Sequence, residues 1–95
     1  MAELNEVIHQ PVRLRIMASL SALGADEQME FATLRDLLGL TDGNLGAHLG
    51  KLEAAGYVRV DKTFLGRKPR TLVSLSSRGR AAFDDHVEAL KALLR

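Results

Sequence analysis

The stretch FATLRDLLGLTDGNLGAHLGKL, residues 31–52, decides the fold because it holds two helical patterns with a short turn between them. The first pattern places apolar residues at helical spacing, at Phe31, Leu34, Leu37 and Leu38. Gly39 stands where the C-terminal stop of that helix is expected, and Thr41 or Asp42 can cap the next helix. Two helices joined by about three residues with a glycine are typical of a helix-turn-helix.

The second helix, expected over about 41–55, has an unusual composition. At 100° per residue its apolar stripe consists of Leu45, Leu49 and Leu52. The opposite face carries small residues, with an amide, a cation and an imidazole along one edge: Gly43, Gly46, Ala47, Gly50 and Ala54, then Asn44, Lys51 and His48. A glycine inside a helix costs about 1 kcal/mol relative to alanine. Three of them indicate that something approaches this backbone closely.

Entry into the DNA major groove is the interpretation that we favour for this bare face. Small residues let the backbone approach phosphates and base edges, Asn44 can pair with adenine, and Lys51 or His48 with guanine or phosphate. The free N–H groups at the helix start add a phosphate site. Two alternatives stay open: another protein helix docks on the glycine and alanine face, or the small residues are simply tolerated.

Helical patterns also flank this stretch on both sides. Apolar residues recur from Val12 to Leu23, with Pro11 in the first turn and Gly24 as the expected end. A leading helical segment, about 2–10, contains Leu4, Val7 and Ile8 and breaks near Pro11. A last helix, about 77–95, follows a cap at Ser76 or Ser77, and its apolar stripe is Phe83, Val87, Leu90 and Leu94, widened by Ala82, Ala89 and Leu93.

Between these helices the apolar period changes from 3.6 to 2. Residues 57–64 and 70–75 alternate and are rich in β-branched side chains, and Gly66 and Pro69 lie between them. The pattern predicts a β-hairpin with a five-residue loop over 65–69. The expected fold is therefore mainly α with a β-hairpin, in the order helix, helix, helix, hairpin, helix.

Charge is unevenly distributed along the 95 residues, although the net charge is only +1. Residues 1–50 hold three basic and seven acidic side chains, whereas residues 51–80 hold eight basic and two acidic ones. The basic cluster Arg67, Lys68 and Arg70 falls at the expected hairpin tip, and Arg59 and Lys62 extend it. This asymmetry favours a polyanion partner, with a solvated charged surface as the alternative.

Other functional classes find little support in the sequence. The three histidines lie in different elements, the glycines fit no nucleotide-binding motif, and there is no cysteine. Asp84, His86 and Glu88 diverge around one helix, so we interpret them as a solvated polar face rather than a metal site. We expect no enzyme activity, cofactor, metal or membrane partner. We also expect a cytoplasmic location and one domain over 1–95.

Three segments together resemble a known group of regulators: HQPVRLRIMASL, FATLRDLLGLTDGNLGAHLGKLEAAGYVRV and GRKPRTLVSLSSRGRAAF. They are similar to small winged-helix DNA-binding regulators close to the MarR and ArsR families of bacterial and archaeal transcription factors, over roughly residues 7–83. The resemblance implies a dimeric regulator with a recognition helix from Thr41 and a wing over 57–76. It places Asn44, Ala47, His48 and Lys51 on DNA, with wing contacts from Arg67, Lys68 and Arg70. Relatives carry larger polar residues near positions 46 and 50.

The sequence thus predicts a sequence-specific regulator of double-stranded DNA that acts as a homodimer, with no effector identified. The expected DNA contacts are Thr41, Asn44, Gly46, Ala47, His48, Gly50, Lys51, Lys62, Arg67, Lys68 and Arg70, with the basic wing 65–70 on the backbone or in the minor groove. The expected dimer interface joins the two terminal helices through Leu4, Val7, Ile8, Val87, Leu90, Leu93 and Leu94. The alternatives are a winged helix that docks a partner protein helix, and non-specific nucleic-acid binding.

Overall fold

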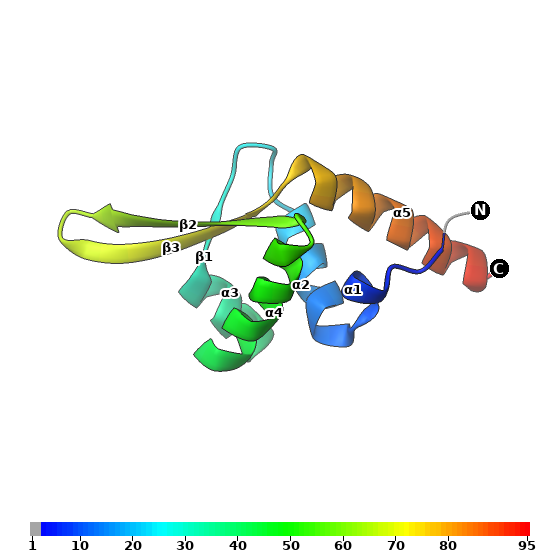
Figure 1. The fold of residues 1–95 in the computed structure, drawn as a ribbon, viewed down its shortest axis with the longest axis horizontal. Coiled ribbons are helices and arrows are strands. Elements are labelled where there is room, and N and C mark those ends of the chain that lie inside the picture. The colour runs from blue at the N-terminus through cyan, green and yellow to red at the C-terminus, as the bar shows by residue number, and fades with distance from the viewer. Residues whose placement is uncertain (1–2) are drawn as a thin grey trace.

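The computed structural model describes residues 3–95, and Figure 1 shows the fold. The elements are α1 (Glu6–His9), α2 (Pro11–Ser21), β1 (Met29–Glu30), α3 (Phe31–Leu38), α4 (Asp42–Ala54), β2 (Val58–Leu65), β3 (Lys68–Leu75) and α5 (Ser77–Leu93). The helices surround one core, and the β2–β3 hairpin extends from it at one end (Figure 1). The expected fold class, a mainly α winged helix-turn-helix, is confirmed.

Aliphatic side chains from α1 to α4 and from both hairpin strands form the core. Its buried members are Ile8, Ile16, Met17, Leu20, Leu34, Leu38, Leu45, Leu49, Leu52, Val58 and Val73. The three leucines expected on the inner face of α4 are all among them. Burying each such side chain contributes roughly 1.5–3 kcal/mol, which fixes α4 with its leucine stripe inward and its glycines outward.

The hairpin is longer and its turn tighter than the sequence predicts. Pairing runs from Val58 opposite Leu75 to Leu65 opposite Lys68, so only Gly66 and Arg67 remain in the turn. The expected five-residue loop is therefore wrong. Gly66 has a φ of +63°, which glycine adopts without strain at the first central position of a type II′ turn. Pairs alternate between hydrogen-bonded and non-bonded, so Pro69 can sit opposite Phe64 without an N–H.

A third strand was not expected from the sequence. β1 has two residues and pairs antiparallel with β3, with Met29 opposite Val73 and Glu30 opposite Leu72. The sheet order is β1-β3-β2, which leaves β2 at an edge. Two residues are too few to show a period of two, so the sequence pattern could not reveal this strand.

Most expected helix ends are found where the sequence places them. Gly39 ends α3 with a φ of +66°, and the Ser76 hydroxyl accepts the Gly79 N–H at 2.9 Å to cap α5. Two expectations are wrong. α2 ends at Ser21, three residues before Gly24, and the leading helix is only the short α1, whereas residue 2 lies outside the described residues.

The buried side of α5 also differs from the expected stripe. Gly79, His86 and Ala89 are buried, whereas Leu94 is exposed. The reason is a close approach: a Cβ on Gly79 would lie 1.8 Å from the carbonyl oxygen of Tyr57. Position 79 must therefore hold a residue without a side chain, whereas Ala82 and Phe83 are half-buried and pack against the core farther along α5.

His86 is fully buried, so its interpretation as part of a solvated face is wrong, although Asp84 and Glu88 are exposed. Its Nδ1 accepts the backbone N–H of Asn5 at 2.9 Å and so ties α5 to the cap of α1. Burial lowers the pKa of His86, and nearby His9 lowers it further.

Candidate nucleic-acid interface

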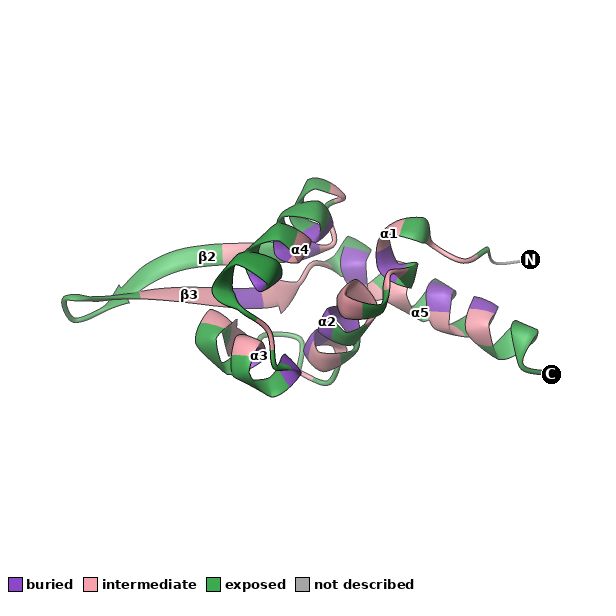
Figure 2. Cartoon of the chain, turned by 90° about the horizontal axis from the view of Figure 1, so that it is seen from below, coloured by how far each residue is buried: buried purple, intermediate pink, exposed green. Residues whose placement is uncertain are grey.

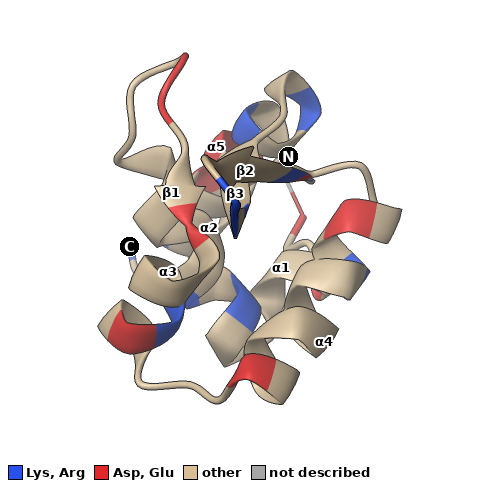
Figure 3. Cartoon of the chain, turned by 90° about the vertical axis from the view of Figure 1, so that its left-hand side faces the viewer, with Lys and Arg blue, Asp and Glu red and all other residues tan. Residues whose placement is uncertain are grey.

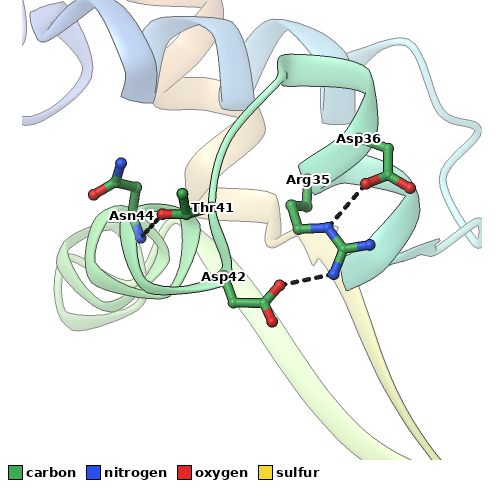
Figure 4. Close-up of polar contacts among 5 residues, drawn as sticks. All are labelled: Arg35, Asp36, Thr41, Asp42 and Asn44. Carbon is green, nitrogen blue, oxygen red and sulfur yellow. Dashed lines mark hydrogen bonds and ion pairs between the residues drawn. The ribbon is translucent and has the colours of Figure 1, made fainter.

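The turn between α3 and α4 is held by local hydrogen bonds. Backbone N–H groups of Gly39 and Leu40 close back on the last carbonyls of α3, with Leu40 bonded to Arg35 at 3.0 Å. The Thr41 hydroxyl then accepts the Asn44 N–H at 3.1 Å, as the sequence predicts for the cap (Figure 4). The Thr41 side chain is therefore the N-cap of α4, and this hydrogen bond determines the residue at which the helix starts.

Arg35 joins α3 to the start of α4, a role that sequence reasoning missed. Its Nη1 lies 2.8 Å from Asp42 and its Nε 2.9 Å from Asp36, as Figure 4 shows. The hydrogen bond from Arg35 holds the pKa of Asp36 below its ordinary value. The guanidinium also offsets the negative charge that Asp42 places at the start of α4. A seven-residue separation from Asp42 gives no recognisable sequence motif.

The outer face of α4 is bare, as the sequence predicts. Figure 2 shows this helix exposed along one side and buried along the other. Gly43, Gly46 and Gly50 are exposed, and a Cβ added to any of them would meet no atom within 4 Å. Ala47 and Ala54 are exposed on the same side. Nothing inside the described chain therefore requires glycine at these positions.

A groove of about 310 Å³ separates this face from the hairpin. Its lining combines α4 with the sheet and the start of α3: Gly46, Leu49, Gly50, Glu53, Val60, Lys62, Thr71 and Phe31. Because Gly46 and Gly50 carry no side chain, the groove opens directly onto the helix backbone. Lys62 places a cation on the opposite wall.

The polar residues along the edge of α4 differ in exposure and in whether their side chains form hydrogen bonds within the domain. Asn44 and Lys51 are exposed, and their side chains have no hydrogen-bond partner among the described residues. His48 is half-buried and lies 3.3 Å from the Arg13 guanidinium, measured from Nδ1 to Nη1. Asn44 and Lys51 are therefore accessible to a ligand, whereas His48 contacts Arg13 of α2.

The basic residues of the hairpin also divide into two kinds. Lys62, Arg67 and Lys68 are exposed and take part in none of the ion pairs between described residues. Arg70, by contrast, is 2.6 Å from Glu30 of β1 and lies farther from the turn than Arg67 and Lys68. Figure 3 looks along the hairpin and shows blue basic residues close to its tip. Arg70 is therefore not part of the free basic cluster expected at the tip, because it forms an ion pair with Glu30.

Two large apolar side chains at the hairpin end were not singled out in the sequence. Phe64 is 68% exposed and Leu65 is 64% exposed, and they directly precede the turn. Their position depends on the exact register of the hairpin, which places them at the tip rather than in a loop.

Two other kinds of site have no candidate in the described part of the chain. Within residues 3–95, no group of three or more metal-ligating side chains is close enough to hold an ion. None of the described helices combines the length and apolar composition that a bilayer crossing requires.

Residues 12–94 match the family model of the winged helix DNA-binding domain. The chain belongs to this family. α3 and α4 are its helix-turn-helix, and the β2–β3 hairpin is its wing.

Relatives of this winged helix domain span most of its length. It is 37% identical over 82 residues to the uncharacterized protein MJ0432 of Methanocaldococcus jannaschii, covering 86% of each chain. Its fold is similar to that of a transcriptional regulator homologue from Pyrococcus horikoshii OT3, with a TM-score of 0.85 and 32% identity, over 95% of this chain and 86% of that one. Streptococcus pneumoniae FabT, solved in complex with DNA, shares the fold alone, with a TM-score of 0.62 and 18% identity, over 94% of this chain and 64% of FabT.

The terminal segments of the winged helix domain gather at the end opposite the wing (Figure 1). Leu93 and Leu94 are 66% and 86% exposed, and the other apolar residues there are half-buried: Leu4, Val7, Val87 and Leu90. Ile8 is different, because it has no exposed surface and belongs to the core. It therefore has nothing to offer the dimer interface in which the sequence placed it.

Proposed function

We propose that this protein is a sequence-specific transcriptional regulator of the MarR and ArsR type, which acts on double-stranded DNA as a homodimer. The observation that carries the proposal is the bare outer face of α4, bordered by exposed cations that no described carboxylate neutralises. Each glycine inside a helix costs about 1 kcal/mol relative to alanine, and a partner that approaches the backbone closely would offset this cost.

α4 enters the major groove, which is wide enough to admit a helix. Asn44 and Lys51 are free to contact base edges, and Ala47 can pack on a thymine methyl group. Gly46 and Gly50 let the backbone come close to the DNA. His48 takes a lesser part because it already contacts Arg13.

The wing supplies phosphate contacts. Lys62, Arg67 and Lys68 extend from the domain on a hairpin that projects beyond it (Figure 1). Phosphate contacts add affinity and position the protein without reading sequence. Sequence preference therefore comes from α4, and most of the salt dependence comes from the wing.

Two solved structures with a similar fold support this proposal. The Pyrococcus horikoshii protein is described as a transcriptional regulator homologue, and FabT was solved with DNA bound. Both have a fold similar to that of this chain.

Homodimerisation places the exposed ends of α5 from two chains against each other. Leu90, Leu93 and Leu94 form the centre of the interface, with Leu4, Val7 and Val87 beside them. Exposed apolar patches of this kind mark interfaces. A twofold dimer would read half-sites about one DNA turn apart.

The proposal is tested by selecting a duplex from a random-sequence pool with the full chain and measuring its affinity by fluorescence anisotropy. Gly50→Glu places a bulky anion on the bare face, so we expect binding to fall by at least about a hundredfold. Ala18→Glu adds the same side chain at an exposed position on α2 and should bind normally. Thermal melts and light scattering must show that both variants remain folded and dimeric.

A winged helix that docks a partner protein helix is the second candidate function. The apolar side chains of Phe31, Leu49 and Val60 in the groove favour it. If Gly50→Glu binds the selected duplex as tightly as the unmodified chain, α4 does not enter the groove of DNA, and protein docking becomes the better proposal.

A further inference from the structure

The wing ends in an apolar tip that the rest of the domain leaves uncovered. Phe64 and Leu65 directly precede the turn, and both keep about two-thirds of their surface exposed, at 68% and 64%. Pro69 lies opposite Phe64 and is also exposed. Successive residues of a strand point to opposite sides, so Phe64 and Leu65 give both faces of the tip an apolar surface.

Cations surround this apolar tip. Arg67 lies in the turn, Lys68 pairs with Leu65, and Lys62 is on the same side of β2 as Phe64. The ion pairs formed by residues 3–95 include none of these three cations. A partner for such a tip must offer negative charge around a surface that accepts apolar groups. The minor groove of DNA does so, because phosphates line its rims and sugars and base edges form its interior.

The tip is narrow, but it enters only a widened minor groove. A turn of two residues leaves two strands whose axes lie about 4.8 Å apart, so the ribbon with its atoms is wider than the roughly 6 Å of the minor groove in B-DNA. Proteins widen this groove when apolar side chains enter between base steps.

We propose that Phe64 and Leu65 form an apolar wedge, which the wing inserts into the minor groove of bound DNA and which loosens the stacking of one base step. The inference rests on the proposed function, since it requires DNA binding. It adds a part for the wing that its charges alone do not provide: deformation of the duplex, and a preference for base steps that unstack easily.

The experiment uses the full chain and the duplex that it selects from a random-sequence pool, with 2-aminopurine replacing one adenine at a time beneath the wing. The unmodified chain should raise 2-aminopurine fluorescence at one step. Phe64→Ala with Leu65→Ala should abolish the rise and weaken binding about tenfold. The salt dependence of affinity should stay unchanged, because no charge is removed.

Two control variants separate the wedge from other effects. Leu37→Ala removes a leucine of similar exposure from α3 and should behave as the unmodified chain does. Phe64→Leu keeps an apolar tip and should retain most of the fluorescence rise. If the unmodified chain binds the duplex without changing fluorescence at any position, the wedge is wrong and the proposed function stands. If it binds no duplex even at low salt, the proposed function itself fails.

Discussion

The glycines of α4 and α5 lie in opposite environments, one exposed and one tightly packed. In α5, Gly79 faces inward, where a Cβ would lie 1.8 Å from the Tyr57 carbonyl oxygen. In α4, Gly46 and Gly50 face outward, where a Cβ would meet nothing within 4 Å. The first glycine is required by contacts inside the chain, whereas the other two are not.

This difference shows which glycines are explained by contacts inside the folded chain and which are not. Gly79 allows α5 to pack closely against the residue that precedes β2. Glycine inside α4 lowers the stability of the helix, and no close contact inside the described chain offsets that loss. No contact inside the described chain accounts for Gly46 and Gly50, and this is why we base the proposed function on the outer face of α4 and not on Gly79.

The largest effect is expected at the inward glycine. In Gly79→Ala, the methyl group clashes with a backbone atom that cannot move aside without shifting α5 or β2. We expect the free energy of unfolding to fall by about 3 kcal/mol, measured by urea denaturation. A loss below about 0.5 kcal/mol would show that the two helices do not differ as described.

Removing charge from the wing should have the next largest effect. Arg67→Ala with Lys68→Ala is expected to weaken binding to selected and unrelated duplexes alike, about tenfold at moderate salt. The slope of log K against log salt should fall by roughly 0.9 for each lost phosphate contact. The comparison variant is Arg78→Ala, which removes an exposed cation from α5. An equal loss from Arg78→Ala would mean that the charge effect is not localised to the wing.

Substitution of the outward glycines is expected to stabilise the fold, the opposite of the effect expected for Gly79→Ala, and by a smaller amount. Gly46→Ala and Gly50→Ala should each raise the free energy of unfolding by up to about 1 kcal/mol. The added methyl groups enter open space, and the alanine backbone loses less conformational freedom on folding. Destabilisation by either variant would show that α4 needs these glycines for its own packing.

The smallest effect concerns His86 on the buried side of α5. Its pKa is lower in the folded chain than its ordinary value of 6.5, so the unfolded chain binds the proton more readily. Stability is therefore fully present above about pH 6.5 and declines as pH falls toward the folded pKa. Urea denaturation at about pH 7.5 and about pH 5.5 should show this decline. It should be smaller in His86→Phe, and equal declines in both chains would contradict the assignment.

The fold could be predicted from sequence wherever periodicity was long enough to be read. The leucine stripe of α4 and the positions of Gly39, Thr41 and Ser76 were sufficient to locate the helix-turn-helix and the start of α5. Two residues of β1 carry no period, and the extent of the hairpin depends on pairing across the turn. The buried side of α5 follows from the approach of Gly79 to Tyr57, which is a tertiary contact.

Parts of the candidate site were predictable for the same reason. Exposure of Asn44, Lys51 and the glycines follows from the helical wheel once the leucines are buried. Partners distant in sequence were not predictable. Glu30 contacts Arg70 and Arg13 contacts His48, and no local sequence pattern indicates contacts between residues so far apart in the chain.

The edge position of β2 has a consequence for solubility. An edge strand leaves backbone N–H and C=O groups free to pair with another chain, and an exposed apolar pair such as Phe64 and Leu65 increases that hazard. Charged residues on an edge oppose such pairing, because two copies would bring like charges together. Lys62, which lies on β2, therefore opposes edge-to-edge pairing of the free protein. Neutralising it should make concentrated solutions of the chain prone to β-rich precipitates even when no DNA is present.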